Sequence, residues 1–171
     1  MMAALRHSLH GVMIRYQDTG ILICGEPCIG KSSLALELIQ HGAILIADDV
    51  VDFTVEENAL MAHCPDLLSG LLHTRELGLM DIREIFDNKA WQACSRVDLC
   101  IELKTIHHSE PSLIKSCPTT TILDKTLEML PLSIENPASV KTRIDIWLRM
   151  QRTPSSHLKN LPICQQNRLT C

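Results

Sequence analysis

One run of residues forms the clearest chemical motif of the chain. Residues 25–32, Gly-Glu-Pro-Cys-Ile-Gly-Lys-Ser, match the phosphate-loop pattern G-x-x-x-x-G-K-[ST] at every fixed position. In such a loop, backbone N–H groups turn towards phosphate oxygens, the lysine neutralises the β- and γ-phosphates, and the final hydroxyl binds magnesium. The motif therefore predicts a site for ATP and Mg²⁺, formed by Gly25, Glu26, Pro27, Cys28, Ile29, Gly30, Lys31 and Ser32. The alternative is a chance match in a turn.

Two adjacent carboxylates follow an apolar run after this motif. Asp48 and Asp49 end the run of residues 43–47, so both are expected at a strand end beside the phosphate loop. Successive strand residues face opposite ways, which predicts different tasks unless the strand has already turned. One carboxylate would bind the metal ion or its water, and the other would take a proton from a nucleophile. The alternative is an acidic pair that ends a strand in solvent.

Two basic residues are weaker candidates. His10 stands beside a glycine, where a histidine is more often a surface or capping residue than a catalytic one. Arg75 lies between Gly70 and Gly78 in a segment otherwise short of basic residues. It can contact a phosphate or pair with a nearby acid, and composition does not separate these two alternatives.

The residues around the phosphate loop predict the elements that position it. Residues 12–14, a turn that contains a glycine and residues 21–24 predict a hairpin that leads into a buried strand. Residues 32–40 place their apolar side chains on one helical face, and His41-Gly42 provides a stop. With residues 43–47 as the next strand, the order predicts a βαβ-like unit whose neighbouring strands share a sheet covered by the helix.

The remainder of the chain predicts one domain followed by a tail. Residues 54–66 are expected to form a surface excursion, and residues 67–86 alternate apolar and polar side chains before a short helix at 80–86. Further expected elements are strands at 98–103 and 130–134, a loop at 104–118 and a helix at 139–150. The catalytic domain is expected to cover residues 1–150, with a polar C-terminal tail at 151–171.

Composition restricts the classes of partner. The chain has 171 residues, a formal net charge of −4 and only 3% aromatic residues, so neither attraction to nucleic acids or anionic membranes nor base stacking is expected. No apolar stretch approaches the roughly 20 residues of a membrane span, which predicts a cytoplasmic protein. The 8 cysteines include no C-x-x-C pair, so we expect reduced thiols that act as small apolar residues.

These motifs, taken in order, resemble one known family. The matching pieces are His10-Gly11 and residues 25–32, 34–38, 47–49 and 65–81. Over roughly residues 8–150, the chain is similar to the catalytic domain of HPr kinase/phosphorylase in its short form, without a separate N-terminal domain. The resemblance implies an α/β P-loop domain of the phosphoenolpyruvate-carboxykinase-like type, with a mixed sheet and flanking helices.

The resemblance also implies an activity and partners. Such an enzyme uses ATP and Mg²⁺ to phosphorylate a serine of the small phosphocarrier protein HPr, reverses this by phosphorolysis with formation of pyrophosphate, and assembles as a homohexamer. The expected function is therefore HPr serine kinase with phosphorylase activity. A small-molecule kinase is an alternative, because the same loop serves many acceptors. A nucleotide-binding regulatory module with reduced catalysis is another.

The resemblance carries roles to individual residues. Catalytic roles are expected for Asp48, His10, Lys31 and Arg75. Asp48 matches the general base for phosphorylation, which returns the proton in the reverse reaction, and Arg75 matches the arginine of the family's signature segment. The expected metal-binding residues are Ser32, Asp49 and His73.

Three positions depart from the family pattern. His73 stands where the family has a magnesium-binding glutamate, and an imidazole is a poorer ligand for so hard a cation. Glu76 replaces a glycine. Residues 133–138 contain no basic residue where the long form has an arginine, so Lys141 or Arg143 are the expected substitutes. ATP binding is therefore a firmer expectation than activity in both directions.

Overall fold

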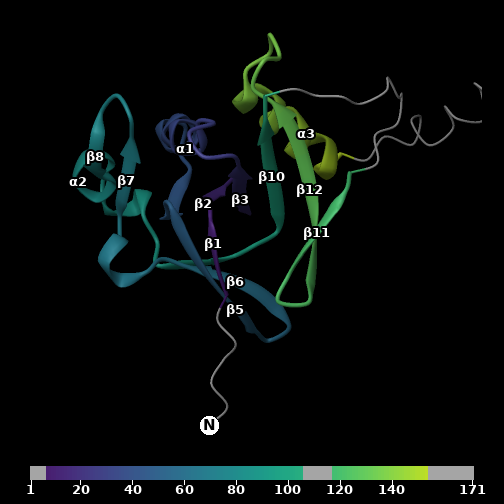
Figure 1. Ribbon diagram of the computed structural model, residues 1–171, viewed down its shortest axis with the longest axis horizontal. Coiled ribbons are helices and arrows are strands. Elements are labelled where there is room, and N and C mark those ends of the chain that lie inside the picture. Colours follow the sequence, from purple (N-terminus) through teal and green to yellow (C-terminus); the bar gives the residue numbers. More distant parts are fainter. Residues whose placement is uncertain (1–6, 106–116, 154–171) are drawn as a thin grey trace, which may run out of the picture.

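A central mixed sheet organises the computed structural model, which describes residues 7–105 and 117–153. Its strand order is β11-β12-β10-β3-β2-β4 (Figure 1). The strands are β2 (Val12–Tyr16), β3 (Thr19–Gly25), β4 (Ile44–Ala47), β10 (Leu99–Lys104), β11 (Thr119–Ile122) and β12 (Lys125–Ser133). β10 pairs in parallel with both β3 and β12, and the other pairs are antiparallel. The predicted α/β class with a mixed sheet is confirmed.

The β2–β3 hairpin is the predicted entry into the phosphate loop. Its two turn residues, Gln17 and Asp18, have φ values of +49° and +63°, the backbone form that matches the twist of antiparallel strands. The flanking apolar residues are buried on both faces of the sheet: Ile14, Ile21 and Ile23 face one side, and Met13 and Leu22 face the other. The strand before the loop is therefore held by core packing along its whole length.

Two helices cover one face of the central sheet. α1 (Lys31–Gln40) buries Leu34, Ala35, Leu38 and Ile39, and α3 (Val140–Arg152) buries Ile144 and Leu148. α1 ends at His41, as predicted, and α3 begins after Ser139, whose hydroxyl accepts a hydrogen bond from Thr142 N. Both predicted helices are confirmed. α3 extends to Arg152, past the expected domain end at residue 150, and residues 154–171 of the predicted tail lie outside the described residues.

The predicted adjacency of the strands on either side of α1 is wrong. β2 lies between β3 and β4 and pairs antiparallel with each of them. The hairpin already occupies that edge of β3, so the chain leaving α1 can pair only with the far edge of β2. β3 and β4 still run in the same direction, which brings their C-terminal ends to the same edge of the sheet.

A second, outer sheet covers the opposite face, with the order β1-β5-β6-β9. Its strands are β1 (His7–His10), β5 (Val50–Glu56), β6 (Ala59–His63) and β9 (Cys94–Arg96). The expectation of a surface excursion at 54–66 is therefore wrong for most of that range, since only residues 57–58 form a turn between the two strands. Phe53, Leu60 and Ala62 are buried against the central sheet, since alternate residues of β5 and β6 face inwards.

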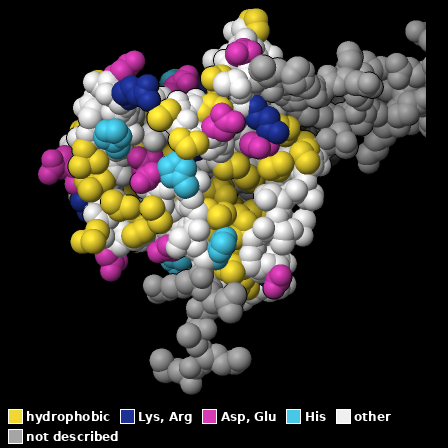
Figure 2. All heavy atoms as spheres, viewed as in Figure 1, with side chains coloured by type: hydrophobic (Ala, Val, Ile, Leu, Met, Phe, Trp, Pro, Cys, Tyr) yellow, Lys and Arg dark blue, Asp and Glu magenta, His cyan; other side chains and the backbone are white. Residues whose placement is uncertain are grey.

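A small hairpin stands beside α1, at the left of Figure 1. It consists of β7 (Leu71–Thr74) and β8 (Gly78–Asp81), continued by the predicted short helix α2 (Ile82–Phe86). The short helices η1 (Asp66–Leu68) and η2 (Asn88–Ala90) flank this unit. Leu77, Leu79 and Ile85 are exposed here, and Figure 2 shows hydrophobic side chains over the same part of the surface.

The remaining expectations concern two strands, a loop and the cysteines. The strand at 98–103 is confirmed as β10, and the one at 130–134 is the end of the longer β12. β11 was not predicted, and most of the expected loop at 104–118 lies outside the described residues. Cys24, Cys28, Cys64, Cys94 and Cys100 carry free thiols, and Cys28 is exposed. Each helix among the described residues is too short or too polar to cross a membrane.

Candidate active site

The phosphate loop joins β3 to α1 and requires glycine at both ends. Gly25 has φ +140° and Gly30 has φ +104°, values that other residues rarely adopt. A Cβ on Gly25 would lie 2.6 Å from the carbonyl oxygen of Leu103, whereas a Cβ on Gly30 would meet nothing within 4 Å. The space over Gly30 is at the start of α1, whose first turn has no acidic side chain. Helix N–H groups favour an anion there.

Lys31 is held against the loop that precedes it. Its side chain is buried, and Nζ donates to the carbonyl oxygens of Gly25 at 3.1 Å and Glu26 at 3.0 Å. These two bonds satisfy an ammonium group that would otherwise be costly to bury. The ammonium therefore lies beside the space where a phosphate would bind.

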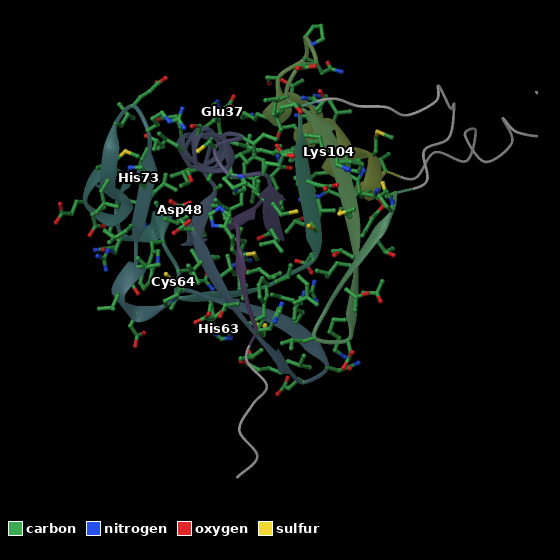
Figure 3. The ribbon with its side chains drawn as sticks, viewed as in Figure 1. Glu37, Asp48, His63, Cys64, His73 and Lys104 are labelled. Carbon is green, nitrogen blue, oxygen red and sulfur yellow. The ribbon has the colours of Figure 1, made fainter. Side chains whose placement is uncertain are left out.

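Asp48 is the buried carboxylate of the site, at the end of β4. Oδ1 accepts a hydrogen bond from Ser32 Oγ at 2.8 Å, and Oδ2 accepts one from His73 N at 2.9 Å. Figure 3 shows His73 on the β7–β8 hairpin and Asp48 beside it, nearer the central sheet. Burial raises the pKa of Asp48, against the lowering effect of the bonds from His73 and Ser32. The site thus holds a carboxyl group with an increased affinity for a proton.

Asp49 faces solvent because the backbone turns sharply at this residue. Its φ is +70°, and Val50 N donates to Asp48 O at 2.9 Å, which closes a three-residue turn. The Asp49 side chain is 69% exposed, and its Oδ1 lies 2.9 Å from His10 Nδ1. β4 ends at Ala47, so the chain has already turned at this pair, and the two carboxylates have different surroundings: Asp48 is buried against the loop, and Asp49 pairs with a histidine at the rim.

A pocket of about 490 Å³ opens over these groups. Its lining contains these predicted site residues: His10, Pro27, Cys28, Gly30, Lys31, Ser32, Asp48, Asp49, His73 and Arg75. Gly25, Glu26 and Ile29 belong to the loop but do not line the pocket. The first two direct their carbonyl groups at Lys31, and Ile29 packs against the core. Residues far apart in the chain, from His10 to Arg75, thus share one cavity.

The donor atoms of the pocket suit a hard cation. Ser32 and both aspartates offer oxygen ligands of the kind that Mg²⁺ prefers. Within residues 7–105 and 117–153, no group of three His, Cys, Asp or Glu side chains converges to hold a metal ion by itself. This pattern fits Mg²⁺, which usually takes one or two carboxylates and completes its shell with phosphate oxygens and water.

Some residues of the pocket were missed by sequence reasoning. Ser33 and Thr74 also line it, and Thr74 Oγ1 accepts a hydrogen bond from Leu77 N that closes the β7–β8 turn. A hydroxyl residue that precedes a turn is a local signal that could have identified Thr74.

The two expected substitutes for the missing arginine are held elsewhere. Lys141 Nζ lies 2.6 Å from Asp145 Oδ2, and Arg143 donates to the Ser133 and Ala138 carbonyls. Neither side chain lines the pocket. Both lie on α3, whose position is set by packing over the sheet, so this expectation is wrong.

Comparisons with known proteins agree with this geometry. A family model described as "HPr Serine kinase C-terminal domain" matches residues 2–165. Among curated relatives, proteins called HPr kinase/phosphorylase from Variovorax paradoxus and Bordetella avium are 46% identical over 101 residues and 45% identical over 97 residues. These matches cover 58% and 56% of this chain but 32% of each relative. The chain thus spans about a third of the curated relatives it matches.

A solved structure extends the similarity to nearly the whole chain. It is described as the Hpr(Ser) kinase/phosphatase from Coxiella burnetii, and it superposes with a TM-score of 0.79 at 26% sequence identity. The match covers 95% of this chain and 98% of the other. The overall fold is therefore shared with that protein.

Proposed function

Because this chain belongs to the family of HPr serine kinase C-terminal domains, we propose that it is an ATP-dependent serine kinase that acts on the phosphocarrier protein HPr. The observation that carries the proposal is the buried Asp48 carboxylate, hydrogen-bonded to Ser32 of the phosphate loop at 2.8 Å. This bond joins a proton acceptor to the part of the loop that would bind magnesium and phosphate.

ATP and Mg²⁺ fit the residues of the pocket. The open space over Gly30 admits phosphate oxygens at the start of α1, and Lys31 and Arg75 supply positive charge from two sides. When bound, magnesium would neutralise phosphate charge and orient the γ-phosphate for transfer. Ser32 and Asp49 are the proposed metal-binding residues, with His73 beside them. On nucleotide binding, Lys31 Nζ would exchange its two carbonyl partners for phosphate oxygens.

Asp48 is the proposed general base. A general base is most effective when its pKa lies near the working pH, and burial shifts the pKa of Asp48 in that direction. Asp48 would take the proton from the attacking serine hydroxyl; in phosphorolysis it would take a proton from the attacking inorganic phosphate and give a proton to the departing serine oxygen. His10, oriented by Asp49 at 2.9 Å, lies at the rim, where a substrate serine would enter. Arg75, which lies in the β7–β8 turn, would bind phosphate oxygens.

The proposed setting follows from the same family. The protein partner is HPr, the location is the cytoplasm, and the assembly is a homohexamer. A protein-sized substrate and the exposed Leu77 and Leu79 next to the pocket support contacts with other chains. Light scattering coupled to gel filtration tests the assembly, and a monomeric mass at micromolar concentration would contradict it.

The decisive experiment is incubation of the full chain with HPr, ATP and Mg²⁺, with phosphoserine on HPr read by intact mass. The expected result is one added phosphate, removed again when inorganic phosphate is supplied, with pyrophosphate as product. Asp48→Asn should retain ATP binding but lose transfer. The exposed Asp124→Asn in the β11–β12 turn is the matched control and should keep activity.

Each negative outcome identifies a different alternative. ATP binding without transfer to HPr or to small molecules would favour a nucleotide-binding regulatory module, in which His73 and Glu76 have removed the activity. Transfer to a small molecule but not to HPr would favour a small-molecule kinase. Transfer retained by Asp48→Asn would remove Asp48 as the base.

A further inference from the structure

Two cysteines from distant parts of the chain meet at the base of the phosphate loop. Cys24 is on β3, directly before Gly25, and Cys100 is on the adjacent parallel strand β10. In the register of these strands, Cys24 lies opposite Glu102, and Cys100 lies opposite Leu22. The two thiols are therefore diagonal neighbours on one face of the sheet, and their Sγ atoms are 3.3 Å apart. No spacing in the sequence indicates this pair.

The two thiols differ in exposure and in proton affinity. Cys100 is 2% exposed, whereas Cys24 is only half-buried and also contacts the Ile101 carbonyl oxygen at 3.4 Å. The hydrogen bond from Cys100 lowers the pKa of Cys24, and the nearby Lys31 ammonium acts in the same direction, against burial and Glu102. The same bond and burial raise the pKa of Cys100. Cys24 is therefore the thiol that loses its proton more readily, and Cys100 is the thiol in contact with it.

We propose that Cys24 and Cys100 form a redox modification site: hydrogen peroxide links them in a disulfide, and the disulfide weakens nucleotide binding by the adjacent phosphate loop. The effect on nucleotide binding rests on the proposed function, whereas formation of the disulfide does not.

The chemistry proceeds in two balanced steps. Cys24 loses its proton, its sulfur attacks one oxygen of hydrogen peroxide, and the O–O bond breaks; the departing hydroxide takes up a proton to become water, and Cys24 becomes a sulfenic acid. The Cys100 sulfur then attacks the Cys24 sulfur, the S–O bond breaks, and the departing oxygen takes the Cys100 proton to leave as water. Two thiols lose two electrons, and peroxide is reduced to two molecules of water.

The phosphate loop has little room to accommodate this change. A disulfide bond is about 2 Å long, so the two sulfurs must approach by more than 1 Å. The next residue, Gly25, already lies so close to β10 that a Cβ there would be 2.6 Å from Leu103 O. Gly25 O also accepts one of the two hydrogen bonds from Lys31. Movement of β3 relative to β10 would therefore displace both the loop and its lysine.

Peptide mapping tests the disulfide directly. The full chain is treated with hydrogen peroxide, remaining thiols are alkylated, and a non-reducing tryptic digest is analysed by mass spectrometry. We expect residues 16–31 linked to residues 97–104, a product reversed by dithiothreitol. Cys28→Ser is the matched control, because it leaves Cys24 as the only thiol of the first peptide. The link should persist in Cys28→Ser and vanish in Cys24→Ala and Cys100→Ala.

The wild-type digest alone can overturn the proposal, so it does not depend on the variants folding. Recovery of Cys24 only as an alkylated thiol or a sulfinic acid after peroxide would contradict the link. A linked peptide that persists in Cys24→Ala would assign the reaction to Cys28 and would also contradict it.

Calorimetric titration with ATP tests the consequence. Oxidation should weaken binding by about tenfold in the wild type, and dithiothreitol should restore it. Cys100→Ala should bind ATP equally before and after peroxide. If the disulfide-linked protein binds ATP with unchanged affinity, the proposed effect of the disulfide on the phosphate loop is wrong. Absence of ATP binding by the reduced protein would instead overturn the proposed function, and the peptide map would still decide the disulfide.

Discussion

At the scale of the residue, the buried carboxylate of Asp48 carries a cost in stability. Burial raises its pKa, so the folded protein holds this proton more tightly than the unfolded chain does. The contribution of Asp48 to stability is therefore largest at low pH and is lost as the pH rises above the ordinary aspartate value of about 4 and through the raised folded value. Ionisation of the buried Asp48 at neutral pH therefore lowers the stability of the folded protein.

Asp48→Asn should remove this loss of stability. The amide can still accept from His73 N and donate to Ser32 Oγ, but it carries no charge. We expect the melting temperature of the variant, relative to the wild type, to rise by a few degrees between about pH 4 and pH 7. Differential scanning calorimetry across that range measures it, with Asp124→Asn as the control. A variant that becomes relatively less stable towards pH 7 would contradict the assignment.

The two glycines of the loop should respond differently to substitution. Gly30→Ala places a side chain in open space, so backbone strain alone should cost about 1–3 kcal/mol. Gly25→Ala adds a collision with Leu103 O, which should cost roughly 1–3 kcal/mol more. Urea denaturation gives both values. The explanation fails if Gly30→Ala proves the more destabilising of the two.

At the scale of the element, α3 is tied to β2 and the β2–β3 turn by Asp145, and Arg152 of the same helix also donates to Gln17. Asp145 accepts hydrogen bonds from Tyr16, Gln17 and Lys141. Burial by itself would raise the pKa of Asp145, but the bonds from Lys141 and Tyr16 lower it below the ordinary value. The ionised form of Asp145 therefore stabilises the fold at pH values above the ordinary aspartate pKa of about 4. This contribution is lost as the pH falls through the lowered pKa of the folded protein.

Asp145→Asn should therefore destabilise the protein at neutral pH. The uncharged amide loses the ion pair with Lys141, and we expect a cost on the order of 1 kcal/mol at pH 7. The difference should shrink as the pH falls below about 4 and through the lowered pKa of Asp145, because the carboxylate becomes protonated first in the unfolded chain and then in the folded protein. Urea denaturation at several pH values measures this, with Asp124→Asn as control. An equal difference at all pH values would exclude the charge as its origin.

At the scale of the whole molecule, one sheet supports two hydrophobic clusters. Leu38 belongs to the cluster under the helices, and Phe53 belongs to the cluster between the two sheets. Both side chains are 0% exposed. Each cluster contains residues of β2, β3 and β10. Unfolding of either cluster would therefore expose strands that also pack in the other cluster.

Unfolding should therefore be a single cooperative transition. Leu38→Ala should cost about 2–5 kcal/mol and Phe53→Ala about 3–5 kcal/mol. Each should lower one common midpoint in urea, followed by tryptophan fluorescence and by far-ultraviolet circular dichroism. Val55→Ala, at an exposed position of β5, is the control. Separate midpoints for the two probes would show that the outer sheet unfolds independently.

Local residue order was enough to predict the phosphate loop and its setting. Gly25, Gly30, Lys31 and Ser32 act within one turn of chain, and the strand before and the helix after follow from apolar spacing. The helix from Ser139 and the hairpin around Gln17 have similarly local causes, a cap and a tight turn. The resemblance added the roles of His10, Asp48 and Arg75, and all three line one pocket.

Only the tertiary structure decided which distant groups meet. The insertion of β2 between β3 and β4, the outer sheet, the bond from His73 N to Asp48 and the contact of Cys24 with Cys100 are all absent from local spacing. The reason is physical: strand pairing joins segments far apart in the chain, and its register is set by which faces are buried together. Periodicity predicts that a strand exists, but packing determines its neighbours.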